Sequence, residues 1–155
     1  MKTLAIYLVA MLCSLTPASA QSQPKAAGDR ERLIGAWHLV RIDPGDSAAQ
    51  SPSAPEPLGI LIYTQDGHMS VQLMYPESAL GLNNEYVRAG YEASFGSYDV
   101  DAAKHTLTHH VQGSITRDLL VGRNLPRLYQ LTEYGHLIIR SADPNEHWSV
   151  TWEHY

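Results

Sequence analysis

The chain has 155 residues, with 11 lysines and arginines against 16 aspartates and glutamates, and its formal net charge is −5. This length suits one domain with one hydrophobic core. Nucleic acids and anionic membrane surfaces require clustered basic residues, and the sequence contains no such cluster, so its composition argues against these partners.

The first 20 residues are typical of a secretory signal segment. Lys2 precedes an apolar stretch at 4–15, and three small residues at 18–20 form a cleavage site. We expect cleavage after Ala20 and a periplasmic or secreted protein. No later stretch approaches the ~20 apolar residues that span a bilayer, so no membrane insertion of the mature chain is expected. The single cysteine, Cys13, lies in this segment, which leaves no cysteine for a disulfide in the mature chain.

Two further segments lack a regular pattern. Residues 21–32 are polar and predict a flexible leader in front of one domain at 33–155. Residues 43–57 hold four prolines among small and polar residues, which predicts a long loop without regular structure. Long surface loops often carry binding residues, so one hypothesis is a protein-interaction module that uses the loop 43–57.

The rest of the chain is dominated by short strand patterns. Strand-like runs lie at 32–42, 58–64, 68–75, 94–100, 105–113, 126–131, 136–142 and 147–155. Turn signals such as Asp66-Gly67 join them as hairpins. Only residues 84–93 predict a helix, with Asn84 as its N-cap. Consecutive hairpins favour an all-β fold, an eight-stranded up-and-down antiparallel barrel with one short helix, over an open sandwich.

Several of these runs resemble a known family. The first strand carries Gly35-x-Trp37, a signature seen near the N-terminus of lipocalins. The runs "GILIYTQDGHMSVQLM", "GSYDVDAAKHTLTHHVQGS" and "PRLYQL" resemble the compact lipocalin-like domain family found in bacteria and fungi. The resemblance extends from about Leu33 to Glu153. It implies a lipocalin-like barrel with an internal pocket, and a structural role for Gly35 and Trp37.

Alternation along the strands predicts which side chains face the barrel interior, because successive residues of a strand point to opposite faces. In each strand the alternate positions that carry the apolar residues form the inward face. Met69, His109, Arg127, Tyr129 and Trp152 occupy such positions. His110 then faces outward, so the adjacent histidines cannot both enter one site from an unbulged strand.

An inward arginine is costly unless it is paired or hydrogen-bonded. One hypothesis is that Arg127, with His109 and either Tyr98 or Tyr129, binds the acidic head group of a mainly hydrophobic molecule. The alternative is structural, since lipocalins often stack an arginine on the Gly-x-Trp tryptophan. In that case Arg127 or Arg140 would close the barrel against Trp37.

His109 also leaves alternatives open. It can be a neutral core histidine bonded to a tyrosine or a carbonyl, or a residue that lines the pocket. No His-x-His or His-Glu-x-x-His spacing exists, so no metal is expected, and no cofactor motif is present. A histidine among tyrosines and an arginine in an apolar cavity also suits a cofactor-independent isomerase or cyclase.

The sequence therefore predicts an exported lipocalin-like protein that binds a small, mainly hydrophobic molecule in the barrel cavity. Catalysis by an isomerase or cyclase in that cavity is the alternative. The predicted ligand-binding residues are Met69, Tyr98, His109, Arg127, Tyr129 and Trp152.

Overall fold

The computed structural model describes residues 28–45, 56–77, 81 and 83–155. The predicted signal segment 1–20, most of the predicted leader and most of the proline-rich loop 43–57 lie outside the described residues. Within the described part of the chain, no helix is long and apolar enough to cross a membrane.

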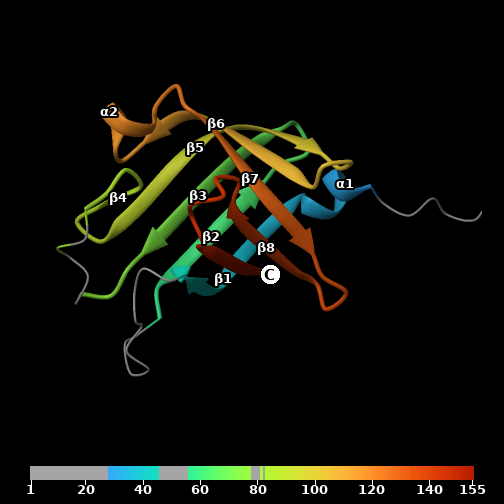
Figure 1. Ribbon diagram of the computed structural model, residues 1–155, viewed down its shortest axis with the longest axis horizontal. Coiled ribbons are helices and arrows are strands. Elements are labelled where there is room, and N and C mark those ends of the chain that lie inside the picture. Colours follow the sequence, from blue (N-terminus) through green and yellow to red (C-terminus); the bar gives the residue numbers. More distant parts are fainter. Residues whose placement is uncertain (1–27, 46–55, 78–80, 82) are drawn as a thin grey trace, which may run out of the picture.

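Strands account for most of the described elements (Figure 1). They are β1 (Gly35–Asp43), β2 (Leu58–Tyr63), β3 (His68–Met74), β4 (Val87–Arg88), β5 (Tyr91–Asp101), β6 (Thr106–Ser114), β7 (Asn124–Leu131), β8 (His136–Ser141) and β9 (Ser149–His154). The two helices are α1 (Asp29–Leu33) and α2 (Arg117–Leu120).

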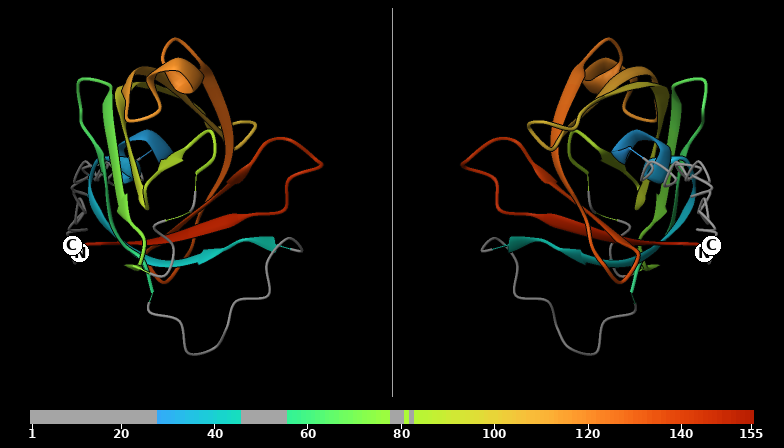
Figure 2. Two further views of the ribbon diagram at one scale, coloured as in Figure 1. Left: turned by 90° about the vertical axis from the view of Figure 1, so that its left-hand side faces the viewer. Right: turned by 90° about the vertical axis from the view of Figure 1, so that its right-hand side faces the viewer.

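The sheet closes on itself. Its strands follow the order β3-β2-β1-β9-β8-β7-β6-β5-β4, and β3 also pairs with β5. Every pairing is antiparallel. Eight strands therefore form a closed barrel, and β4 is an extra strand beside β5, which confirms the predicted barrel. The views along the barrel show the strands as a ring with α1 across its opening (Figure 2).

Closure requires a close approach of backbones at β5, the strand that pairs with both β3 and β6. Gly96 lies opposite Met69 on β3 and Val111 on β6, and the register of β5 against β6 shifts between Phe95 and Gly96. A Cβ atom at Gly96 would collide with the carbonyl oxygen of His110. Such irregularities bend strands, and this one lies where the sheet must curve.

The helix predicted at residues 84–93 is wrong. The structure has the short strand β4, a turn through Ala89 and Gly90 in left-handed conformations, and the start of β5. Asn84 does accept backbone N–H groups with its side chain, from Tyr86 and Val87, both at 2.8 Å. This Asx-type turn uses the same chemistry as a helix N-cap, so the local signal was ambiguous.

Helix α1 covers one end of the barrel and was not expected from the sequence, since it lies at the end of the predicted leader. Its Leu33 is fully buried, and the Leu33 carbonyl accepts the indole N–H of Trp37 at 2.9 Å. The Asp29 carboxylate accepts the Tyr129 hydroxyl at 2.8 Å. The other end of the barrel carries α2, β4 and the segment that joins β8 to β9 (Figure 1).

Gly35 and Trp37, the pair predicted to be structural, lie together beside α1. The Trp37 ring packs on the His154 ring, with centroids 3.7 Å apart. A side chain at Gly35 would collide with the same His154 ring, and Gly35 has a φ of +139°. Glycine therefore leaves the space in which His154 packs against Trp37.

Candidate functional site

All six residues predicted to bind a ligand face the barrel interior. Each is at least nine-tenths buried. The alternation of the strands predicts this for all of them except Tyr98, whose facing was not predicted. They are Met69, Tyr98, His109, Arg127, Tyr129 and Trp152. Their role in binding stays a prediction. Met69, Tyr98, Tyr129 and Trp152 belong to the main hydrophobic core, whereas His109 and Arg127 are buried polar residues.

Tyr98 and Tyr129 belong to the end covered by α1. The Tyr98 hydroxyl donates to the carbonyl of Thr64 at 3.0 Å, and the Tyr129 hydroxyl donates to Asp29. The guanidinium of Arg30, on α1, lies 5.3 Å from the Tyr98 ring centroid. Both hydroxyls are therefore engaged by groups that hold this end of the barrel together, rather than by His109 or Arg127.

The tyrosine that pairs with His109 is Tyr63, which the sequence did not identify. The Tyr63 hydroxyl lies 2.7 Å from Nε2 of His109. Burial, reinforced by the charge of Arg127, lowers the pKa of His109 to about 3, and burial raises the pKa of Tyr63. Both groups are then neutral at physiological pH, and they share one hydrogen bond between the hydroxyl and Nε2, whose direction depends on the histidine tautomer.

Arg127 lies among aromatic rings. Its guanidinium carbon is 4.9 Å from the ring centroid of Trp148 and 5.4 Å from that of Tyr86. Its Nη2 donates to the Tyr86 hydroxyl at 3.0 Å, and its Nη1 donates to the Pro126 carbonyl at 3.4 Å. Within the described residues, no carboxylate forms an ion pair with Arg127.

The alternative role for an arginine, stacking on Trp37, is wrong. Trp37 packs on His154, whereas the guanidinium of Arg127 lies over Tyr86 and Trp148. Arg140 faces outward and donates to the side-chain oxygen of Gln130 at 3.4 Å. Its position follows from the strand register, because Arg140 lies opposite Leu128 of β7, which is itself exposed.

Glu92 is a second inward residue that the sequence analysis missed. It shares the parity of Ser94 and Tyr98 on β5, both of which are buried. Burial raises the pKa of Glu92 to about 7, against the opposing effect of the positive charge of Arg127. The alternation of β5 would have placed Glu92 inside, but the residue fell within the helix predicted at 84–93.

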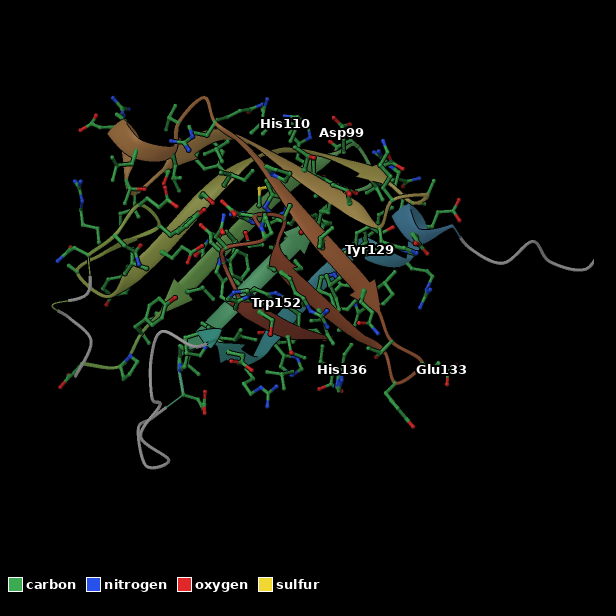
Figure 3. All side chains as sticks on the ribbon, in the orientation of Figure 1. Asp99, His110, Tyr129, Glu133, His136 and Trp152 are labelled. Atoms are coloured by element: carbon green, nitrogen blue, oxygen red, sulfur yellow. The ribbon has the colours of Figure 1, made fainter. Side chains whose placement is uncertain are left out.

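His110 faces outward, as the pleat predicts. Its Nε2 lies 2.8 Å from a carboxylate oxygen of Asp99, and its Nδ1 lies 2.7 Å from the side-chain oxygen of Asn124 (Figure 3). Hydrogen bonds to Asn124 and Asp99 raise the pKa of His110. The two adjacent histidines thus have pKa values shifted in opposite directions.

A surface cavity of about 340 Å³ lies beside α1, away from Arg127. Its lining is Asp29, Arg32, His105, Leu128, Tyr129, Gln130, Leu131, Ile138 and Arg140. Tyr129 is the one predicted ligand residue that lines it. No group of three or more histidine, cysteine, aspartate or glutamate side chains within the described residues is placed to hold a metal ion.

The comparison with protein families agrees with this architecture. The model of a family described as a lipocalin-like domain matches residues 34–154. No curated protein matches the chain. Among solved structures, the crystal structure of the wild-type fluorescent protein UnaG has a TM-score of 0.42 and 10% sequence identity, over 81% of this chain and 98% of that chain. An asparagine-to-alanine mutant of UnaG has a TM-score of 0.42 and 11% identity, over 81% and 97%.

The two adjacent histidines should differ in their effect on stability. His109→Ala removes a buried ring and leaves the Tyr63 hydroxyl without its hydrogen-bond partner, so the free energy of unfolding should fall by about 1–3 kcal/mol. His110→Ala acts at the surface and should change it by no more than about 0.5 kcal/mol. Urea denaturation of the three proteins measures both values. Equal losses would show that the two side chains are not on opposite faces.

Glu92 should make stability depend on pH. Its pKa rises from 4.5 to about 7 on folding, so the folded state favours the protonated form. The cost of ionising Glu92 is absent below the unfolded pKa, grows as the pH rises and is complete above about pH 7. Glu92→Gln should therefore be more stable than the native chain at about pH 8, by up to about 3 kcal/mol.

The same two proteins should have equal stability near pH 4, where the native glutamate is protonated in both states. Denaturation across this pH range measures the difference directly, because the titration of His109 is common to both proteins and cancels. A difference that is constant between about pH 4 and pH 8 would show that Glu92 is not a buried, titrating group.

Proposed function

The chain belongs to the lipocalin-like domain family, and we propose that it binds a small, mainly hydrophobic molecule with an acidic head group inside its barrel. An eight-stranded barrel has an interior just wide enough for side chains or one small ligand. The observation that carries the proposal is the guanidinium of Arg127, which is inside the barrel and has no carboxylate partner among the described residues.

Arg127 has the capacity to bind an anion. A guanidinium has five N–H donors. Arg127 donates two hydrogen bonds, both to neutral oxygens, those of Pro126 and Tyr86. Aromatic faces attract the cation but do not neutralise it. A carboxylate can accept two parallel N–H bonds from the guanidinium, which neutralises the charge and satisfies its donors together.

The groups around Arg127 suit an anion because they add little charge of their own. His109 and Tyr63 form a neutral pair. Glu92 is the one titratable acid that faces Arg127 from β5, and its raised pKa keeps part of it protonated near neutral pH. Protonation of Glu92 removes a competing negative charge, so mildly acidic conditions favour the binding of an acid at Arg127.

The remaining interior suits a hydrophobic tail. The residues of β3 that share the parity of Met69 are Val71 and Leu73, and both are buried. Trp148, just before β9, and Val150, within β9, contribute partly buried apolar surface. Burial of an apolar tail against such walls contributes about 25 cal/mol for each Å² removed from water. The head group would then set the orientation of the ligand.

Catalysis by an isomerase or cyclase has less support than binding. A general base works best when its pKa lies near the operating pH. The pKa of His109 is about 3, so it is a weak base at neutral pH, and its Nε2 is already hydrogen-bonded to the Tyr63 hydroxyl. The interaction module that would use the loop 43–57 stays an untested prediction, because most of this loop lies outside the described residues.

We further propose export through cleavage after Ala20, to the periplasm or the cell exterior. Support comes from the sequence pattern of residues 1–20, a basic residue, an apolar stretch and a small-residue cleavage site. A ligand-binding protein at either place would meet hydrophobic molecules outside the cytoplasm.

Arg127→Met should weaken binding of a fluorescent fatty acid by about tenfold to a hundredfold, because a hydrogen-bonded charge pair is lost while the volume of the side chain is kept. Arg140→Met is the matched control, since Arg140 faces outward and should leave the affinity unchanged. A fluorescence titration measures the three affinities, and a thermal melt checks that each variant is folded. An Arg127→Met protein with native affinity, or an equal loss in Arg140→Met, would refute the head-group site.

Export predicts a defined N-terminus. The chain expressed with a C-terminal tag in a bacterial host should be recovered outside the cytoplasm and should begin at Gln21. Cell fractionation followed by N-terminal sequencing tests this, with a chain that begins at Gln21 from its own start codon as the cytoplasmic control. Recovery of the whole protein from the cytoplasm with residues 1–20 still attached would contradict export.

A further inference from the structure

Trp152 carries a hydrogen-bond donor that the fold does not use. Its side chain points into the barrel from β9 and is 3% exposed (Figure 3). The indole N–H is buried and has no hydrogen-bond partner among the described residues. The chain has three tryptophans, and the other two are satisfied, since Trp37 donates to the Leu33 carbonyl and Trp148 donates to Glu146.

The neighbours of Trp152 across the sheet carry no polar side chain. Its direct neighbours across the sheet are Leu39 on β1 and Leu137 on β8. Both belong to or pack against the main hydrophobic core. On the β8 side the backbone lies in a regular ladder, whose carbonyls accept hydrogen bonds, while on the β1 side the register shifts between Leu39 and Arg41. A buried donor in such a place is unusual, because buried polar groups are nearly always paired.

A bound water is a poor partner for this donor. A buried water molecule is retained when it makes two to four hydrogen bonds to polar groups. The neighbours of Trp152 across the sheet are leucines, so a water there would gain the indole N–H and little else. An acceptor carried by an otherwise apolar molecule meets the donor without that loss.

Trp152 lies further along the same stretch of chain as Trp148, the tryptophan that contacts Arg127. Trp148, whose ring lies against the guanidinium of Arg127, precedes β9 directly. Trp152 is four residues further along, which is roughly 13 Å at the rise of a strand. Trp148, Val150 and Trp152 are in alternate positions, so their side chains lie on the same face. A ligand held by its head at Arg127 and extended along β9 toward α1 would pass Trp152 well along its tail.

We infer that the ligand is an acid whose hydrophobic chain carries a second oxygen acceptor, a keto group, which accepts the indole N–H of Trp152. This inference rests on the proposed binding of an acid at Arg127 and specifies the class of ligand. A ketone oxygen fits better than a hydroxyl, because a hydroxyl brings a proton of its own that the leucines cannot accept. Trp152 is thereby a specificity-determining residue of the site.

The first test compares matched ligands. Stearic acid, its positional oxo derivatives and the corresponding hydroxy derivatives compete against a fluorescent fatty acid for the native chain and for Trp152→Phe. In the native chain the best oxo derivative should bind about tenfold more tightly than stearic acid, with the hydroxy derivative between them. Trp152→Phe should remove this preference, so that the oxo and unsubstituted acids bind this variant with equal affinity, since phenylalanine has no donor.

The second test observes the donor itself and does not depend on a variant. The indole N–H groups give three resonances in a ¹⁵N-correlated NMR spectrum of the native chain. Addition of the oxo acid should move the Trp152 resonance downfield, as expected for a newly formed hydrogen bond. Stearic acid should not produce that downfield shift. The Trp37 resonance is the internal control, because its N–H is already held by Leu33.

The outcomes separate the inference from the proposed function. If stearic acid binds in an Arg127-dependent way but oxo and unsubstituted acids bind equally, the head-group site stands and the role of Trp152 is refuted. An oxo preference that persists in Trp152→Phe also refutes it. If none of these acids binds the native chain, both the proposed function and the inference are refuted.

Discussion

Closure of the sheet between β3 and β5 brings every second side chain of eight strands into one enclosed interior. Most of those side chains are apolar. Arg127, His109 and Glu92 also point inward, because the alternation of their strands places them on the interior face. Polar groups in such a place must find partners or change their protonation state. The chemistry of this interior therefore follows from barrel closure together with three positions in the sequence.

Arg127 is the charge to which the other interior groups respond. Its charge acts with burial to lower the pKa of His109, and it opposes the effect of burial on Glu92 and Tyr63. Near neutral pH the interior holds one permanent cation, a neutral histidine–tyrosine pair and a partly protonated acid. Because α1 covers one end of the barrel, an acid would reach Arg127 from the other end, with its tail directed toward Trp152.

The strands and their facing could be predicted because a period of two is visible within a single strand. His109, Arg127 and Trp152 were placed inside on that basis alone. Tyr63 could not be placed, since its strand, "LGILIY", is apolar almost throughout and shows no alternation. Its pairing with His109 also depends on how the barrel brings β2 and β6 together. Glu92 was missed for a local reason, because the side chain of Asn84 forms a turn that looks like a helix start.

The central claim is that the barrel interior, and not the surface cavity beside α1, holds the acid. Diffraction from crystals of the chain grown with palmitic acid tests this most directly. The account predicts electron density for the carboxylate within hydrogen-bond distance of the guanidinium of Arg127, with the alkyl chain inside the barrel. Density for the acid only in the cavity lined by Arg32, His105 and Arg140, with the interior filled by side chains, would contradict it.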